Sequence, residues 1–181
     1  AAAAASRMGA KTALITMNTE TIGEMSCNPA IGGLGKGHLV REIDALDGLM
    51  AKAIDSSGIQ FRMLNRSRGP AVHGPRSQAD RKLYKSAIKT LLKSEKNLSI
   101  IESTIKDLKI KNRTVHGVVL ENDKILKSKS VILTTGTFLG GIIHIGKEKF
   151  PAGRIGDKSS IVLSKKIRKL DLPIGRLKTG T

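Results

Sequence analysis

The sequence predicts an α/β fold in which an antiparallel β-meander interrupts a mainly parallel sheet. Three observations lead to this prediction. Residues 1–17 have the pattern of a helix end, a glycine stop at Gly9 and an apolar strand, which is the second half of a βαβ unit. Apolar and polar residues then alternate between about residues 98 and 126. Finally, Val131 to Thr135 is a continuous apolar run, typical of a strand buried on both faces of a parallel sheet.

Length and composition favour one substantial hydrophobic core and a strongly basic surface. The chain has 181 residues, of which 39% are hydrophobic, and 32 Lys and Arg against 15 Asp and Glu give a net charge of +17. This charge attracts polyanions such as RNA, DNA or an anionic membrane, although a merely solubilising basic surface fits the composition equally well. No apolar run approaches the roughly 20 residues that a membrane span needs.

Cysteine usage favours a reducing, cytoplasmic setting, with an organellar relative left open. The single cysteine excludes an internal disulfide framework, and it forms no zinc motif with the four histidines.

The first half of the chain is expected to contain two amphipathic helices. The spacing of apolar residues predicts one helix over Gly35 to Ala53, ending near Gly58, and a second over Ser77 to Ser94. Lys11 to Met17 and Ile59 to Leu64 are expected to be strands. The apolar stripe of the first helix is Leu39, Ile43, Leu46, Leu49, Met50 and Ala53, and that of the second is Leu83, Ala87, Ile88, Leu91 and Leu92.

The second half is expected to be mainly strands. The meander insertion is assigned to roughly 98–129, with strands at 98–101, 105–110, 115–120 and 124–126. The apolar run 131–135 then returns to the main sheet. The last expected elements are a strand at 142–145, a loop at 151–154 and a helix at 161–170 capped by Ser159 or Ser160.

The most chemically specific stretch is Met25 to Arg41, MSCNPAIGGLGKGHLVR, which places Cys27 beside a glycine-rich turn that leads into a helix. A thiol gains reactivity when a helix N-terminus or a nearby cation stabilises its thiolate, and Lys36 and Arg41 supply positive charge here. The alternative interpretation is a small buried hydrophobic residue, which is how most single cysteines behave.

The glycines at 32–37 do not form a nucleotide triphosphate loop. The pattern G-x-x-x-x-G-K-[ST] is not met, because residue 30 is Ala and Gly37 follows Lys36. The glycines are expected to let the backbone pass close to a cofactor or substrate, with simple tight packing as the alternative.

Several long strings resemble one family. These are residues 26–61, 64–84 and 131–146, together with PAGRIGD at 151–157 and GRLKTGT at 175–181. They are similar to the MnmG (GidA) family of FAD-containing tRNA uridine modification enzymes. The resemblance implies that residues 1–181 are part of an FAD-binding, Rossmann-like domain, incomplete at both ends. The family's GGGHAG flavin turn is expected to precede residue 1, and its second half to follow Thr181.

The resemblance also implies an activity and its components. The family adds a carboxymethylaminomethyl or aminomethyl group to carbon 5 of the wobble uridine in tRNA. It uses FAD, NADH as reductant and methylene-tetrahydrofolate as carbon donor. The expected partners are tRNA, an MnmE-like GTPase and a second copy of the complete protein.

Individual positions acquire roles through the resemblance. Cys27 matches a catalytic cysteine of the family, while Ile105 and Ser160 match FAD contacts. A thiolate could add to carbon 6 of uracil and activate carbon 5, or the thiol could donate or shuttle a proton, and the sequence does not decide between these roles.

Three further assignments complete the expected site. Thr135 and Gly136 lie in a turn that approaches the cofactor, and Asn18 follows the strand that should end beside the adenosine ribose. An Asp or Glu is usual at that last position. Arg66 and Arg68, in a basic Gly-Pro loop, are candidates for tRNA phosphates, or alternatively for the flavin phosphates.

Two other functions compete with this interpretation. One is a folate- and FAD-dependent tRNA uracil methyltransferase. The other is a non-catalytic RNA-binding module, whose footprint would be Arg62, Arg66, Arg68, Arg76, Arg81, Lys82 and Lys85. The aromatic content of 2% argues against the module, because proteins that bind single-stranded RNA commonly stack bases on aromatic side chains.

Overall fold

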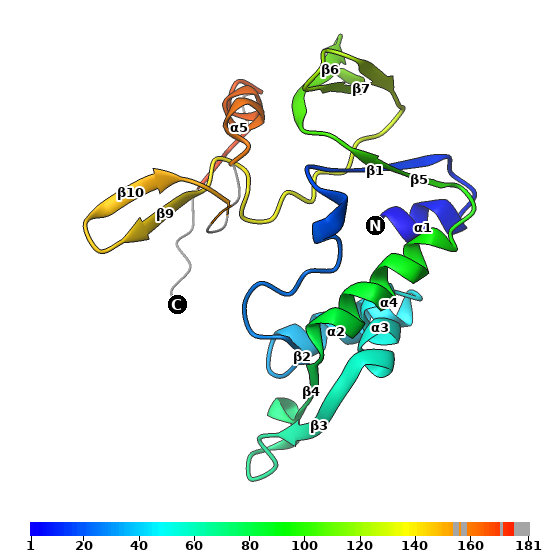
Figure 1. The fold of residues 1–181 in the computed structure, drawn as a ribbon, viewed down its shortest axis with the longest axis vertical. Coiled ribbons are helices and arrows are strands. Elements are labelled where there is room, and N and C mark those ends of the chain that lie inside the picture. The colour runs from blue at the N-terminus through cyan, green and yellow to red at the C-terminus, as the bar shows by residue number, and fades with distance from the viewer. Residues whose placement is uncertain (154–155, 157–158, 171, 176–181) are drawn as a thin grey trace. The chain divides into compact units, whose positions relative to one another are not determined.

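The computed structural model describes residues 1–153, 156, 159–170 and 172–175 and divides the chain into two compact units, Ala1–Glu102 and Ser103–Thr181. Both units mix helices and strands, as the predicted α/β class requires (Figure 1). The helices are α1 (Ala2–Arg7), α2 (Lys36–Ala45), α3 (Leu49–Ser57), α4 (Arg81–Lys93) and α5 (Ile161–Arg168), with short 3-10 turns η1 (Thr19–Thr21) and η2 (Pro70–Val72). The strands are β1 (Thr12–Thr16), β2 (Ala30–Gly32), β3 (Gly58–Leu64), β4 (Gly74–Ala79), β5 (Leu98–Glu102), β6 (Ile105–Lys111), β7 (Thr114–Leu120), β8 (Ile125–Lys127), β9 (Ile142–Ile145) and β10 (Glu148–Pro151).

The first unit contains a parallel strand pair covered by a helix. β1 and β5 run parallel from Thr12 opposite Leu98 to Thr16 opposite Glu102, and α1 packs against both strands. Helix α1 ends before Gly9, whose φ of +87° confirms the predicted glycine stop. The segment 98–101 was predicted to belong to the meander, and this is wrong. Alternation of apolar residues indicates a strand but not its partner, and here the partner is β1.

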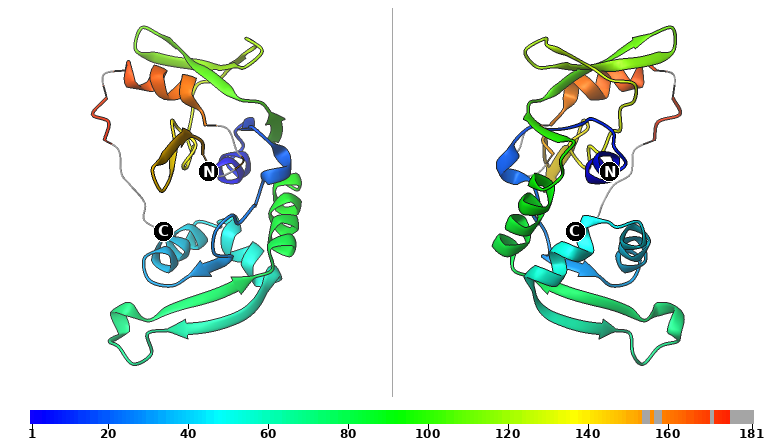
Figure 2. Two further views of the ribbon diagram at one scale, coloured as in Figure 1. Left: turned by 60° about the vertical axis from the view of Figure 1, so that its left-hand side comes forward. Right: turned by 90° about the vertical axis from the view of Figure 1, so that its right-hand side faces the viewer.

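The core of the first unit lies between a three-stranded antiparallel sheet and two helices. The sheet has the order β2-β4-β3, and α3 packs against α4 beside it (Figures 1 and 2). The buried cluster consists of Ile31, Ala53, Ile54, Ala79 and Tyr84. Burial raises the pKa of the Tyr84 hydroxyl, because its ionised form would lose solvation.

Strands β2 and β4 were not predicted, and Ser77 to Ala79 end a strand instead of beginning a helix. Helix α4 begins four residues later than expected because Asp80 is its N-cap. One carboxylate oxygen of Asp80 accepts the backbone N–H groups of Lys82 at 2.8 Å and Leu83 at 2.9 Å.

The single helix predicted over residues 35–53 is in fact two helices, α2 and α3. Asp47 has a φ of +59°, and a Cβ at Gly48 would lie 2.3 Å from the Cγ2 of Ile43, so the chain turns sharply here. Arg7 forms an ion pair with Asp47 at 3.1 Å. A side-chain hydrogen bond from Lys52 lowers the pKa of Asp47. A glycine beside a residue with positive φ breaks the helix in spite of the continuous apolar stripe.

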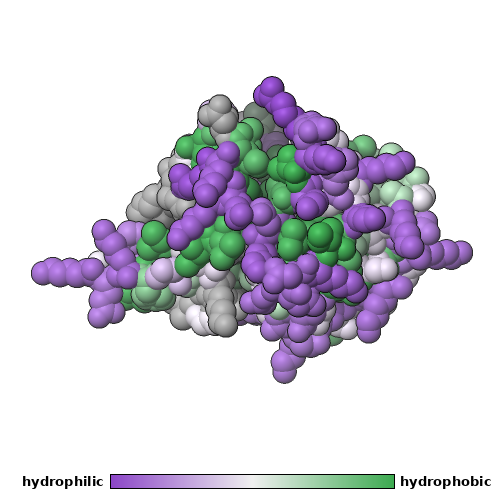
Figure 3. All heavy atoms as spheres, turned by 90° about the horizontal axis from the view of Figure 1, so that it is seen from above, coloured by the Kyte–Doolittle hydropathy of each residue, from purple (hydrophilic) through white to green (hydrophobic). Residues whose placement is uncertain are grey.

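The stripe of α2 also differs from the prediction, because it faces solvent. Leu39, Ile43 and Leu46 are 61%, 46% and 80% exposed, whereas the stripe of α3 reaches the core at Ala53. Exposed apolar residues are not confined to α2, since hydrophobic residues also lie between hydrophilic ones on the face seen from above in Figure 3. Periodicity shows that these apolar residues share one face of the chain. It does not show whether another element packs against that face, and in the described part of the chain the face is exposed.

The second unit contains the predicted antiparallel sheet and an additional hairpin. β6, β7 and β8 form a meander in sequence order, which confirms the predicted strands from 105 onward. β9 pairs antiparallel with β10, a strand that was not predicted, so Pro151 ends a strand instead of starting a loop. Arg154 and residues 176–181 of the last matched string lie outside the described residues.

The apolar run Val131 to Thr135 is not a strand in the structure. Ile132 and Leu133 are 67% and 42% exposed, and none of the described strands pairs with this segment. An apolar run becomes a strand of a parallel sheet only when neighbouring strands satisfy its backbone groups.

Candidate functional site

Cys27 is exposed on the loop that joins η1 to β2. The guanidinium group of Arg81, the first residue of α4, donates a hydrogen bond to the Met25 carbonyl at 2.9 Å and another to the Cys27 carbonyl. The backbone N–H of Ala79 donates to the Pro29 carbonyl at 2.7 Å. The loop backbone is therefore attached to the residues around the start of α4, while the thiol remains open to solvent.

Among the described residues, the cation that hydrogen-bonds to the Cys27 main chain is Arg81, which the sequence did not single out. The ammonium group of Lys36 donates to the Ala30 carbonyl at 2.9 Å, and Arg41 has no recorded polar contact among the described residues. Arg81 takes this position although it lies 54 residues further along the chain. No sequence signal next to the cysteine could have identified it, because the contact depends on how α4 packs.

Close backbone packing requires glycine at one position of the glycine-rich turn and at Gly74 opposite it. A Cβ at Gly32 would lie 2.1 Å from the Pro75 carbonyl oxygen, and one at Gly74 would lie 3.1 Å from the main chain of Gly33. Gly35 differs, because it has a φ of +78° and open space where its Cβ would be. The tight-packing alternative thus accounts for Gly32 and Gly74, whereas Gly35 leaves room for a ligand to approach the backbone.

Asn18 lies two residues beyond the carboxyl end of β1, the edge where parallel α/β sheets bind dinucleotides. Its side-chain oxygen accepts the Glu20 N–H at 2.8 Å, so this oxygen caps η1. Glu102, at the end of the neighbouring strand β5, uses one carboxylate oxygen to accept Thr19 N–H at 2.8 Å and Thr19 Oγ1–H at 2.6 Å. These hydrogen bonds lower the pKa of Glu102 and keep it ionised.

Glu102 is a candidate ligand residue that sequence reasoning missed. A carboxylate at the carboxyl edge of the parallel pair is the group that commonly binds ribose hydroxyls in dinucleotide folds. Its signal was available in the sequence, since an acidic residue ends the apolar run LSIIE at residues 98–102. The signal was overlooked because this strand was assigned to the meander.

In the second unit, the structure brings Ser160 to the turn that contains Thr135 and Gly136. Phe138 N–H donates to the Thr135 carbonyl at 3.2 Å, and Ser160 N–H donates to the Phe138 carbonyl at 2.8 Å. Gly136 has a φ of +56° and open space around its missing Cβ. The turn therefore presents bare backbone, as a close cofactor approach requires. Ser160 is the N-cap residue of α5, but its side chain accepts no hydrogen bond from the first turn, so the predicted capping hydrogen bond is absent.

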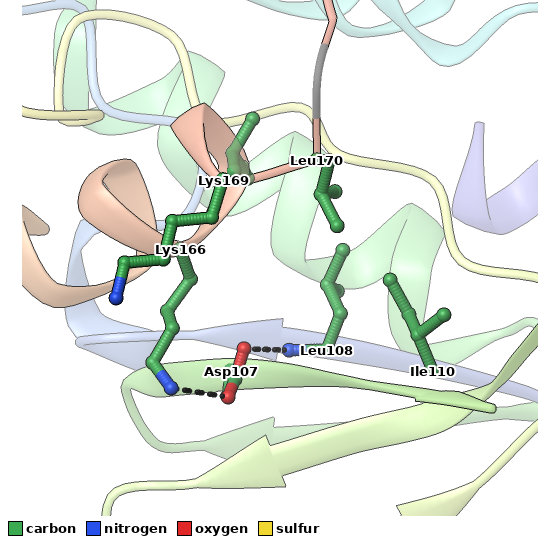
Figure 4. Close-up of a pocket in the computed structure, with 7 residues that line it drawn as sticks. Asp107, Leu108, Ile110, Lys166, Lys169 and Leu170 are labelled. Carbon is green, nitrogen blue, oxygen red and sulfur yellow. Dashed lines mark hydrogen bonds and ion pairs between the residues drawn. The ribbon is translucent and has the colours of Figure 1, made fainter. Parts of the chain in front are cut away.

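Ile105 begins β6, the strand on which α5 packs. A groove between β6 and α5 is lined by Asp107, Leu108, Ile110, Lys166, Ile167, Lys169 and Leu170 (Figure 4). Lys166 forms an ion pair with Asp107 at 3.0 Å, and the Asp107 carboxylate also accepts the Leu108 N–H at 2.8 Å. The Asp107 carboxylate and the Lys166 ammonium group of this groove are therefore paired with each other.

Arg66 and Arg68 are exposed on the loop between β3 and η2. The loop is ordered by hydrogen bonds from the Asn65 amide to the Val72 carbonyl at 2.9 Å and between the His73 ring and the Arg68 carbonyl at 2.9 Å. The sequence contains no acidic residue between Asp55 and Asp80. Among the described residues, neither arginine has an ion-pair partner.

The candidate residues therefore fall into separate groups. Asn18, Cys27, Arg66 and Arg68 belong to the first unit, whereas Ile105, Thr135, Gly136 and Ser160 belong to the second. The described residues contain no cluster of His, Cys, Asp and Glu that could bind a metal ion. They also include no helix with the length and apolar character needed to cross a membrane.

The parallel strand pair with its helix, the antiparallel side sheet and the meander define a Rossmann-type α/β protein. The family model described as glucose inhibited division protein A matches residues 1–181, and the chain belongs to this family. It is similar to the Granulibacter bethesdensis protein named tRNA uridine 5-carboxymethylaminomethyl modification enzyme MnmG. The identity is 60% over 184 aligned residues, which cover 100% of this chain and 29% of that protein.

Solved structures support the fold. The structure is similar to GidA of Aquifex aeolicus with a TM-score of 0.89 and 51% identity, covering 95% of this chain and 28% of that one. A GidA-related protein from Thermus thermophilus matches with a TM-score of 0.61 and 18% identity, covering 94% of this chain and 63% of that one, and shows the fold alone. The chain thus spans less than a third of the length of its curated relative and of the Aquifex protein.

Proposed function

We propose that the chain is part of an FAD-dependent enzyme that adds a carboxymethylaminomethyl or aminomethyl group to carbon 5 of the wobble uridine in tRNA. The observation that carries the proposal is the 60% identity to MnmG of Granulibacter bethesdensis along the whole chain. The exposed thiol of Cys27 and the net charge of +17 agree with a uracil-directed enzyme that binds a polyanion.

The chain offers backbone and side-chain groups that suit FAD. In the first unit, the Asn18 amide and the Glu102 carboxylate lie at the carboxyl edge of β1 and β5, where a ribose could be bound. In the second unit, Gly136 presents main-chain groups beside open space, Ser160 is hydrogen-bonded to the Phe138 carbonyl of the same turn, and Ile105 begins β6. Bound flavin would supply the redox chemistry, with NADH as the proposed reductant.

We assign to Cys27 the nucleophilic or proton-transfer step on the uracil ring. Its thiolate could add to carbon 6, which places electron density on carbon 5, or the thiol could shuttle a proton. Methylene-tetrahydrofolate is the proposed carbon donor. An MnmE-like GTPase and a second copy of the complete protein are the proposed partners, and the cytoplasm is the proposed location.

We also assign Arg66 and Arg68 to the tRNA backbone. Arginine binds phosphate through a planar fork of N–H donors, and both side chains are exposed on an ordered loop without a competing carboxylate. Lysine outnumbers arginine in the chain by 21 to 11, yet the stretch between Asp55 and Asp80 contains arginine and no lysine. A merely solubilising surface does not account for this choice.

The test is to compare the complete wild-type protein with its Cys27→Ser and Ser26→Ala variants. Modified wobble nucleoside is quantified by mass spectrometry, and bound flavin and tRNA affinity are measured on the same preparations. Cys27→Ser should lose most modification and retain flavin and tRNA binding, because a hydroxyl is a far weaker nucleophile than a thiol, whose ordinary pKa is about 8.5. Ser26→Ala, which changes the neighbouring exposed residue, should behave like the wild type.

The other possible results of this experiment support different roles of Cys27 or different functions of the protein. Activity of Cys27→Ser within a few-fold of the wild type would show that the thiol is not catalytic. Joint loss of flavin and activity would move Cys27 to a cofactor-packing role. A wild-type protein that forms 5-methyluridine would be a tRNA methyltransferase, and one without flavin or any nucleoside product would be an RNA-binding module.

A further inference from the structure

The loop that bears Cys27 is anchored at both ends. At its start, the Met25 side chain packs against the buried cluster of the first unit. At its end, the Pro29 carbonyl accepts the Ala79 N–H at 2.7 Å. Between these anchors the Cys27 main chain has one recorded hydrogen bond among the described residues, and its donor is Arg81.

Arg81 is poorly placed for helix stability alone. It is the first residue of α4, and the first turn of that helix contains no acidic residue. A cation at a helix N-terminus faces the positive end of the helix dipole, which is unfavourable. The Asp80 carboxylate already accepts two N–H groups of the first turn, so the helix start does not require the guanidinium. What Arg81 contributes is its pair of hydrogen bonds to the loop.

The geometry of these hydrogen bonds suits arginine specifically. Nε donates to the Met25 carbonyl at 2.9 Å, and Nη2 donates to the Cys27 carbonyl. One planar group thus spans two carbonyls that are two residues apart. A lysine ammonium is a point charge on a flexible stem and lacks this fixed pair of donor directions.

We propose that Arg81 is a positioning residue that fixes the Cys27 loop so that the thiol meets the uracil ring in a reactive geometry. The catalytic part of this inference rests on the proposed function of Cys27. Misplacement of a reacting group by about 1 Å can lower a rate by roughly 100-fold, so loss of the two hydrogen bonds should affect the chemical step more than tRNA binding.

The test compares Arg81→Ala, Arg81→Lys and the control Lys93→Ala in the complete protein. Lys93 is an exposed cation in the last turn of α4, and among the described residues its side chain forms no hydrogen bond or ion pair. The first readout is turnover, with kcat and KM for tRNA determined separately. Arg81→Ala should lower kcat by about 10- to 100-fold and leave KM within about twofold. Arg81→Lys should lie in between, and Lys93→Ala should match the wild type.

The second readout is loop order, measured without turnover. A nitroxide label is attached to Cys27, with any cysteine outside residues 1–181 replaced by serine, and its mobility is recorded by electron paramagnetic resonance. The label should become more mobile in Arg81→Ala, less so in Arg81→Lys, and remain unchanged in Lys93→Ala. If Arg81→Ala does not fold, Arg81→Lys decides the question, because it retains the charge and most of the stem.

Unchanged label mobility together with unchanged kcat would overturn the proposal, and so would a loss of activity that appears only in KM. Increased label mobility with unchanged kcat would overturn the catalytic part and leave a structural contact. A wild-type protein that forms no modified nucleoside would refute the proposed function, while the label would still report whether Arg81 orders the loop.

Discussion

Replacement of Gly32 by alanine tests whether the glycine-rich turn serves packing or ligand approach. Gly32 has a φ of +110°, and an added Cβ would lie 2.1 Å from the Pro75 carbonyl oxygen and 2.8 Å from the Arg76 Cα. Both are main-chain atoms of β4 and cannot rotate away. The alanine variant must therefore separate β2 from β4, including the hydrogen bond from Gly33 N–H to the Pro75 carbonyl at 2.9 Å.

The expected loss of unfolding free energy is about 3 to 5 kcal/mol. The backbone conformation alone costs a residue with a Cβ about 1 to 3 kcal/mol. Each weakened hydrogen bond between the two strands adds about 1 kcal/mol. Gly35→Ala is the matched control, because Gly35 also has a positive φ but open space around its Cβ, and it should cost only about 1 to 2 kcal/mol. Gly69→Ala, at a φ of −64° and in open space, should be neutral or slightly stabilising.

The assay is urea unfolding of the complete protein followed by circular dichroism, with bound flavin measured on the same samples. The packing argument requires Gly32→Ala to be the least stable of the three variants. If Gly32→Ala were as stable as Gly35→Ala but had lost its flavin, the glycine would serve cofactor approach and the reasoning from β4 would be refuted.

Three further predictions address the surface, the core and the response to acid. Replacement of both Arg66 and Arg68 by alanine should reduce the slope of log tRNA affinity against log salt concentration by about 0.7 to 0.9 for each lost phosphate contact. An unchanged slope would show that the two arginines do not contact the tRNA phosphates. Ile54→Ala should cost about 2 to 5 kcal/mol in urea unfolding, since Ile54 is 6% exposed within the core, and a cost below about 1 kcal/mol would contradict this packing. Hydrogen bonds from Thr19 lower the pKa of Glu102 in the folded protein. The Glu102 carboxylate therefore contributes its full stabilisation above the ordinary glutamate pKa of 4.5, and this stabilisation is lost as the pH falls through the lower folded pKa. Glu102→Gln should therefore reduce the acid dependence of thermal unfolding, and an identical pH profile would refute this assignment.

The local sequence pattern was sufficient to predict features that depend on a single segment of the chain. The glycine stop after α1 was predicted correctly, because a positive φ at Gly9 needs only local chain geometry. The strands of the meander from residue 105 onward followed from their alternation and their turns. Cys27 was singled out by its neighbours in the sequence, and in the structure this residue is exposed.

Tertiary structure decided every question that depends on a partner distant in the chain. The pairing of β5 with β1 could not be read from alternation, because a period of two is the same in parallel and antiparallel sheets. The run at 131–135 has the composition of a buried strand, but a strand also requires a neighbour for its backbone groups.

At the candidate site, too, the sequence determined some features and the tertiary structure determined others. The sequence placed the charges of Lys36 and Arg41 near Cys27 along the chain, whereas packing of α4 added Arg81, which hydrogen-bonds to the Cys27 carbonyl. The sequence by itself determined which residues are chemically capable and which local turns they form. Only the tertiary structure decided which of them meet, because hydrogen bonds and packing join groups that the chain separates by dozens of residues.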